Sequence, residues 1–185
     1  MARELEGRLG FAIAGALLFN GSILLDGARP TVGQRLLRSR GGALFAGLTT
    51  ELTFRRQFAR LFSPTHPLTD DEAEDQWALL SHAAGHRIAY RTIHYMDERE
   101  RFTDRWHGAF RDWPGPLSLV WGLDDPVATV DVLEGLRALR TGVPVTELLG
   151  VGHYPQIEAA DAIARALDAA LSRRDAPSTP RPPRR

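Results

Sequence analysis

Two stretches indicate the fold class: Gly150-Val151-Gly152-His153-Tyr154-Pro155 and, upstream of it, Trp121-Gly122-Leu123-Asp124-Asp125-Pro126. In each, an apolar run ends in small residues and is followed by a titratable side chain and then by a helical pattern. Active-site loops hold this position on α/β scaffolds, where a strand ends. The two side chains are the carboxylate of Asp125 and the imidazole of His153. A carboxylate that orients a histidine base makes up two members of a catalytic triad, and the nucleophile is the third.

Composition sets the outer limits. The 185 residues fit one domain with a sizeable core. Lys plus Arg and Asp plus Glu both number 23, so the net charge is zero and nothing calls for nucleic acid or an anionic membrane as a partner. The absence of cysteine excludes disulfides and thiolate metal sites. Because the longest apolar run, residues 9–19, is too short to cross a bilayer, we expect a soluble, cytoplasmic protein.

Short apolar runs alternate with amphipathic helical patterns in the second half of the chain. The runs Leu117–Trp121 and Val143–Leu149 predict buried strands, and Val130–Leu139 and Ile157–Leu171 predict helices. A further buried strand is predicted at Ala14–Phe19. Strands that alternate with helices favour a parallel sheet with helices on its faces, so the expected fold class is α/β.

The intervening segment, from about 30 to 113, reads as helical throughout. A helix that begins near Val32 is expected to end at Gly41-Gly42, and a longer one is expected from Leu44 to Phe62. The stretch Thr69-Asp70-Asp71-Glu72 is a capping box, because the threonine hydroxyl can accept a bond from a free amide and the glutamate can reach back. It predicts a helix that starts at about Asp70.

From about Phe11 to Leu171 the chain resembles the C-terminal part of an α/β-hydrolase, of the group that contains haloalkane dehalogenases, epoxide hydrolases and mesoderm-specific-transcript-like proteins. The matching features are a strand that ends in Asn20-Gly21-Ser22, the helical insertion in the place of the cap domain, Trp-Gly-x-x-Asp-Pro at 121–126, and Gly152-His153-Tyr154-Pro155. The resemblance implies that Asp125 is the triad acid and His153 the base. It also implies, more weakly, that Asn20 and Tyr154 contact substrate, and it implies no metal and no cofactor.

The same resemblance divides the chain into four parts. Residues 1–29 would hold the end of the nucleophile helix and the first retained strand, and 30–113 the cap. Residues 114–172 would complete the hydrolase core, and 173–185, rich in proline and arginine, would be a disordered tail. The expected sheet is therefore only the last three parallel strands of an eight-stranded one.

The nucleophile elbow, Gly-x-Ser-x-Gly or its aspartate equivalent, does not occur in the 185 residues. We therefore hypothesise that the sequence is an incomplete reading of a longer enzyme and is inactive as given. Ser22 follows a strand, but it lacks the glycine spacing of an elbow and is better explained as a turn residue.

Other polar clusters have simpler explanations than chemistry. His82 and His86 stand four residues apart, with His94 further along, but no glutamate lies between them as in His-Glu-x-x-His, so a cap-helix face suits them better than zinc. The acidic residues from Asp70 to Asp75 suit the N-terminus of a helix.

The resemblance implies hydrolysis of a small organic molecule. A serine nucleophile would act on an ester through an acyl-enzyme, whereas an aspartate nucleophile would act on a haloalkane or an epoxide. Asp125 and His153 suit both. The alternative is a non-catalytic, degenerate hydrolase whose open sheet edge and helical insertion bind a partner protein. The oligomeric state stays open.

Overall fold

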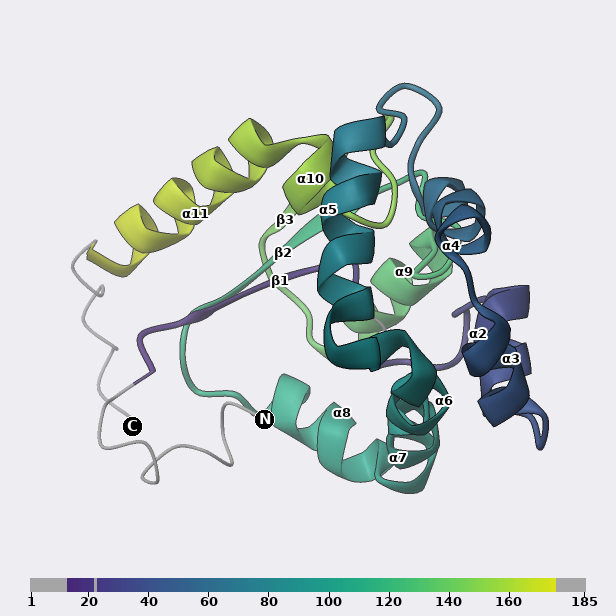
Figure 1. Ribbon diagram of the computed structural model, residues 1–185. Helices are drawn as coiled ribbons and strands as arrows, with labels where there is room; N and C mark the ends of the chain where they lie inside the picture. Colours follow the sequence, from purple (N-terminus) through teal and green to yellow (C-terminus); the bar gives the residue numbers. More distant parts are fainter. Residues whose placement is uncertain (1–12, 22, 176–185) are drawn as a thin grey trace, which may run out of the picture.

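A three-stranded sheet forms the centre of the computed structural model, which describes residues 13–21 and 23–175 (Figure 1). The strands are β1 (Ala16–Phe19), β2 (Leu117–Gly122) and β3 (Val145–Leu148). They lie in the order β1-β2-β3, and both pairs are parallel. The expected parallel sheet of an α/β fold is thereby confirmed, although β1 and β3 are shorter than the apolar runs that predict them.

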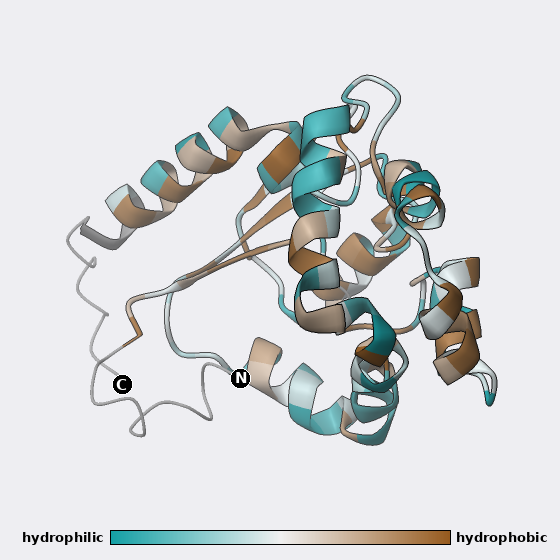
Figure 2. Cartoon of the chain, in the orientation of Figure 1, coloured by the Kyte–Doolittle hydropathy of each residue, from teal (hydrophilic) through white to brown (hydrophobic). Residues whose placement is uncertain are grey.

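β2 is the central strand, and all of its residues are buried. Its register with the neighbouring strands pairs Ala16 with Leu117 and Leu119 with Val145. A parallel strand covered on both faces has no polar side to show, which is why its sequence is a continuous apolar run rather than an alternating one. β1 and most of β2 stand out as hydrophobic in Figure 2, whereas β3 carries the polar Thr146 and Glu147.

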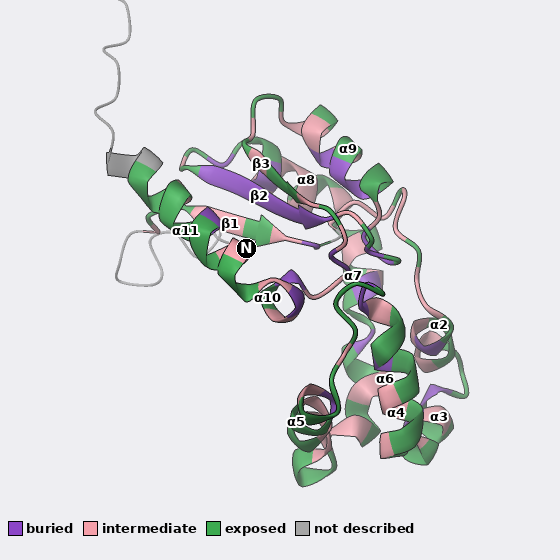
Figure 3. Cartoon of the chain, turned by 90° about the horizontal axis from the view of Figure 1, so that it is seen from above, coloured by how far each residue is buried: buried purple, intermediate pink, exposed green. Residues whose placement is uncertain are grey.

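Helices cover both faces of the sheet. α9 (Val130–Leu139) connects β2 to β3, while the short α10 (Pro155–Glu158) and the longer α11 (Ala160–Asp175) follow β3. Figure 3 shows α9 and α11 on opposite faces. The core on the α9 side is built from buried apolar side chains that include Phe110, Trp113, Leu119, Trp121, Val132 and Leu133.

The segment between β1 and β2 is helical throughout, as its sequence predicts. We call α2 to α8 the helical insertion; most of it lies beyond the carboxyl ends of the strands (Figure 3). Its elements are α2 (Val32–Arg38), α3 (Gly42–Leu48), α4 (Glu51–Phe58), the 3-10 helix η1 (Ala59–Leu61), α5 (Asp70–Ser81), η2 (His82–Ile88), α6 (Ala89–Thr92), α7 (Tyr95–Arg101) and α8 (Thr103–Arg111).

The single helix expected from Leu44 to Phe62 is wrong, because two helices and a 3-10 turn occupy this stretch. The break lies at Thr49 and Thr50. The Thr50 hydroxyl accepts a bond from the Thr53 amide, and the Thr53 hydroxyl accepts one from the Thr50 amide, so a capping box starts α4. The capping box expected at Thr69 is present and starts α5 at Asp70.

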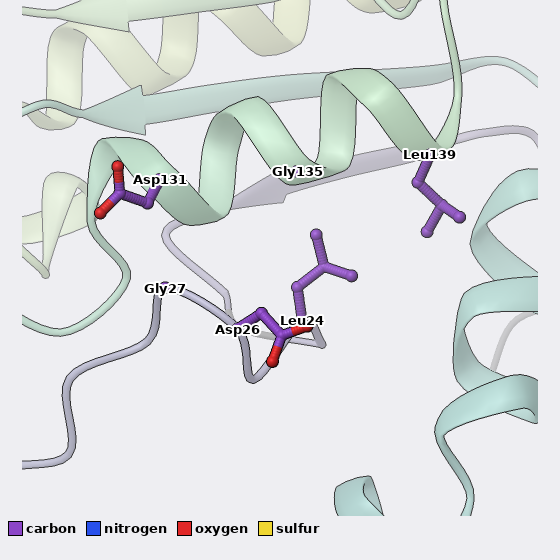
Figure 4. A pocket seen from close by; sticks show the side chains of 6 residues that line it. All are labelled: Leu24, Asp26, Gly27, Asp131, Gly135 and Leu139. Atoms are coloured by element: carbon purple, nitrogen blue, oxygen red, sulfur yellow. The ribbon is translucent and has the colours of Figure 1, made fainter.

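The loop that follows β1 packs on α9, as Figure 4 shows from close by. The Thr129 hydroxyl donates to the Gly27 carbonyl (2.9 Å), and Ala28 forms an isolated bridge with Ala128. Gly135 lets the Leu24 side chain pack directly on α9, since a Cβ atom at this position would lie 2.7 Å from the Leu24 Cδ1 atom. The depression between loop and helix measures about 400 Å³. These bonds tie the loop that follows β1 to the loop that follows Asp125.

The C-terminal helix differs in its limits from the sequence expectation. The predicted helix 157–171 is broken at Ala159 into α10 and α11, and α11 continues to Asp175, so residues 173–175 of the expected tail are helical. The rest of that tail, the N-terminal helical pattern and Ser22 lie outside the described residues. Within the described ranges, no helix combines the length and the apolar character that crossing a membrane requires.

Candidate active site

Asp125 lies in the turn that follows β2, and only 4% of it is exposed. Its Oδ1 atom accepts hydrogen bonds from the Val127 amide (2.7 Å) and the Ala128 amide (3.0 Å). An aspartate that binds the amides two and three residues later closes a turn of its own chain. One carboxylate oxygen therefore fixes the loop, and Oδ2 remains for other partners.

His153 follows β3, and close backbone contacts bring its loop against the end of β2. The Asp124 amide donates to the Val151 carbonyl (2.9 Å). A Cβ atom at Gly122 would lie 2.4 Å from the Gly152 carbonyl oxygen, which no side chain could accommodate. Glycine at 122 therefore permits the two loops to touch. This contact explains the glycine of the motif Trp-Gly-x-x-Asp-Pro.

The structure brings Asp125 and His153 together. The His153 Nδ1 atom lies 2.7 Å from Asp125 Oδ2. An ionised carboxylate can only accept, so this geometry suits the histidine tautomer that has its proton on Nδ1 and its lone pair on Nε2. Among the described residues, Nε2 has no hydrogen-bond partner, and the side chain of His153 is 21% exposed, against 0% for Asp125. The basic nitrogen therefore faces away from the carboxylate and is accessible.

Asn20 supports this pair from the end of β1. Its Nδ2 atom donates to Asp125 Oδ2 (2.7 Å) and to the Gly122 carbonyl (3.1 Å), and its Oδ1 atom accepts from the Gly122 amide (2.8 Å). The residue is buried and has a φ of +40°, a conformation that asparagine tolerates better than most residues. Its polar atoms are engaged inside the protein, and substrate contact by Asn20 stays a prediction.

Tyr154 stands between His153 and the helical insertion. Its ring centroid lies 4.9 Å from that of Phe58 and 5.5 Å from that of Phe62, and the His153 ring meets it edge-on at 5.0 Å. Burial raises the pKa of the Tyr154 phenol, with smaller contributions from Tyr95 and Asp125. The uncharged tyrosine ring therefore packs against the imidazole. Contact between Tyr154 and substrate also stays a prediction.

Two acidic residues near the pair have structural partners instead. Asp124 accepts a hydrogen bond from the Ser63 hydroxyl (2.9 Å), so its side chain serves the helical insertion and not His153. Glu158 is buried and binds backbone amides around the histidine loop. Neither Glu158 nor Ser63 was predicted from the sequence. An acidic residue in the first turn of a helix is ordinarily explained by the helix dipole, and the bond that joins Glu158 to Ser63, 95 positions away, leaves no local signal.

The remaining histidines do not assemble into a site. His94 pairs with Asp97, and the His86 ring packs on Trp77. No group of three or more His, Cys, Asp or Glu side chains that could hold a metal ion occurs in the described part of the chain.

A cavity of about 250 Å³ lies beside His153. Its wall includes Asn20 and, from the helical insertion, charged and aromatic residues: Arg38, Tyr95, Arg99 and Glu100. Burial lowers the pKa of Arg99, whose guanidinium lies 4.6 Å from the Tyr95 ring centroid. The hydrogen bond to Glu100 is the largest of the effects that raise the pKa of Arg38. The cavity therefore combines an imidazole from the sheet with a polar wall from the insertion.

The family model described as "Alpha/beta hydrolase family" matches residues 7–166 of this chain. The chain belongs to that family. The relatives of this hydrolase-family chain include the "Putative hydrolase LipZ" of Mycobacterium tuberculosis, which is 53% identical over 166 residues, covering 90% of this chain and 58% of LipZ. The mesoderm-specific transcript protein of Mus musculus is 31% identical over 160 residues, covering 83% of this chain and 46% of that protein.

Solved structures share the fold. An alpha/beta hydrolase fold protein from Burkholderia ambifaria superposes with a TM-score of 0.70 at 20% identity, covering 89% of this chain and 59% of that one. The chain therefore spans a little over half of the length of LipZ and of this structure. The likeness confirms the fold, and the family membership confirms the resemblance that the motifs indicate.

Proposed function

We propose that this hydrolase-family chain supplies the acid and the base of a nucleophile-His-Asp triad that hydrolyses a small organic molecule. The observation that carries the proposal is the 2.7 Å hydrogen bond between His153 Nδ1 and Asp125 Oδ2, with Nε2 left free beside a cavity. Family membership and the hydrolase name of LipZ support it.

In the proposed reaction, His153 Nε2 removes a proton. If the nucleophile is a serine, that proton comes from its hydroxyl, and the oxygen attacks the carbonyl carbon of an ester. The imidazolium then gives the proton to the departing alkoxide, which leaves as the alcohol, and water deprotonated by His153 hydrolyses the acyl-enzyme to the carboxylic acid and the free serine. If the nucleophile is an aspartate, its carboxylate displaces halide or opens an epoxide, and His153 then deprotonates the water that hydrolyses the alkyl-enzyme ester. In both cases the buried Asp125 carboxylate stabilises the imidazolium that forms.

The proposal assigns the nucleophile to sequence outside these 185 residues, since they contain no elbow motif. It also assigns the helical insertion the role of a cap over the substrate. The wall that α2 and α7 contribute to the cavity beside His153 supports that role.

The test extends the chain upstream. The genomic frame upstream of Met1 is translated and the extended chain is assayed with p-nitrophenyl esters, haloalkanes and epoxides. We expect one class of substrate to turn over, and His153→Ala to reduce that turnover by about a thousandfold or more. His82→Ala, at an exposed histidine in η2, is the matched control and should leave turnover unchanged. Undiminished turnover in His153→Ala would contradict the proposal.

A non-catalytic binding role is the second candidate, and the open side of β1 favours it. In the described part of the chain β1 is an edge strand, and a cavity of about 510 Å³, walled mainly by apolar residues, lies beside it. This role predicts that the 185-residue chain by itself is a well-folded protein of defined oligomeric state with no turnover, and that an upstream stop codon leaves no room for an elbow.

A further inference from the structure

Glu158 is a buried carboxylate that hydrogen-bonds neither Asp125 nor the His153 ring. Only 9% of the residue is exposed. Its Oε2 atom accepts hydrogen bonds from the Gly152 amide (2.7 Å) and the Ser63 amide (2.9 Å), and its Oε1 atom accepts one from the Tyr154 amide (3.0 Å). Three N–H donors on both oxygens match the ionised, acceptor-only form of the side chain.

These bonds hold the backbone on both sides of His153. Gly152 and Tyr154 donate to Glu158, and the His153 amide itself donates to the Leu61 carbonyl (2.9 Å). Three successive amides of the loop are therefore bound. With the backbone fixed, the imidazole is left with its side-chain rotations, and the bond to Asp125 restricts those.

The loop is packed too closely for any other residue at position 152. A Cβ atom on Gly152 would lie 2.6 Å from the Leu61 carbonyl oxygen, 2.8 Å from the Ser63 nitrogen and 3.0 Å from Glu158 Oε1. Glycine at 152 therefore allows the Glu158 carboxylate to bind the amides on both sides of His153. The contact needs both residues, the glycine for its small size and the glutamate for its two acceptor oxygens.

We propose that Glu158 is a positioning residue for the reaction proposed above, and that it acts by clamping the His153 loop so that the imidazole meets Asp125. The inference rests on the proposed function for its catalytic meaning. Ser63 extends the clamp, because its amide binds Glu158 and its hydroxyl binds Asp124, next to the acid. The same carboxylate thus joins the loop of the base to the helical insertion and, through Ser63, to the loop of the acid.

The test uses amide hydrogen exchange and imidazole NMR on the ¹⁵N-labelled 185-residue chain, so it needs no nucleophile. Glu158→Gln keeps one carbonyl oxygen. In the Oε2 place this oxygen satisfies Ser63 and Gly152, and the Tyr154 amide then faces an NH₂ group. We expect exchange at Tyr154 alone to become about tenfold faster or more, as loss of a bond to a charged acceptor predicts. Glu158→Ala should accelerate exchange at all three amides and broaden the His153 Nδ1–H signal.

The control is Glu74→Gln, which neutralises an exposed glutamate on α5 and should change none of these signals. A His153 ring signal that is identical in wild type and Glu158→Ala would overturn the proposal, as would unprotected Gly152 and Tyr154 amides in the wild type. If Glu158→Ala does not fold, the selective effect of Glu158→Gln decides. Protected amides together with a wild-type ring that makes no bond to Asp125 would instead count against the proposed function and leave the clamp intact.

Discussion

Asn20 holds three groups in place from a backbone conformation that few side chains adopt. Its side chain bridges both backbone polar groups of Gly122 and donates to Asp125, at a φ of +40°. These contacts link the end of β1 to the end of β2 at the point where the acid is presented. An asparagine after a strand reads in sequence as an ordinary turn residue. Its partners, more than a hundred positions away, appear only in the folded chain.

We predict that Asn20→Gly lowers the free energy of unfolding by about 1–3 kcal/mol, because the buried amide of Gly122 loses its partner while glycine keeps the backbone conformation accessible. Asn20→Ala should cost more, since alanine adds strain at positive φ. Urea unfolding measures both. Equal stability of wild type and Asn20→Gly would show that these hydrogen bonds contribute nothing net.

At the scale of elements, the spacing of apolar residues predicted the positions of helices and strands, which short-range interactions largely determine. The amphipathic stripe of Val130–Leu139 gave the limits of α9, because each of its buried residues recurs at helical spacing. The apolar runs predicted three strands. The fully buried one, β2, is the central strand and pairs with β1 and β3. The pairing of Asp125 with His153 was expected from the family resemblance. The bond between Glu158 and Ser63 could not be predicted, because it joins segments 95 positions apart. The nearer bonds of Glu158 accept from the backbone amides of Gly152 and Tyr154, which side-chain patterns do not mark.

The break between α3 and α4 shows where a local signal was present but weak. The Thr50–Thr53 capping box has threonine where the usual pattern has glutamate or glutamine. The apolar pattern from Leu44 to Phe62 continues across it, so the sequence predicts a single helix. We predict that Thr50→Ala lowers the free energy of unfolding by about 1 kcal/mol, through loss of the N-cap.

The neighbouring residue provides the control for that prediction. Thr49 is the C-cap of α3, and its capping bond runs from its backbone amide to the Ala46 carbonyl, which alanine keeps. Thr49→Ala removes only the bond from its hydroxyl to the Phe45 carbonyl (3.0 Å), so it should change stability by less than about 0.5 kcal/mol. Thermal unfolding followed by circular dichroism distinguishes the two variants. Equal effects at 49 and 50 would mean that the hydroxyl cap does not define the start of α4.

At the scale of the whole molecule, the described residues place no further strand beyond β1. β1 is an edge strand, Leu18 on it is 39% exposed, and the adjoining cavity of about 510 Å³ is walled by Trp106, Phe110 and Trp113 among others. Exposed edges and apolar hollows promote association between chains.

We therefore predict that the 185-residue chain self-associates with rising concentration and binds an apolar fluorescent dye, and that Leu18→Lys weakens both effects. Leu44→Lys, at a more exposed leucine on α3, is the control and should change neither. Sedimentation velocity over a hundredfold range of concentration is the measurement. A chain that stays monomeric and binds no dye over this range would contradict the prediction.

The place of the helical insertion between β1 and β2 has a consequence for the order of folding. During synthesis, a ribosome releases β1 and then every helix of the insertion before Leu117, the partner of Ala16, emerges. β1 can therefore pair with β2 only after the whole insertion has been synthesised. Closing so long a loop of unstructured chain is entropically costly. Helices that form locally in the meantime shorten the effective loop. The insertion would then act as a folding scaffold that brings the two strands within reach of each other.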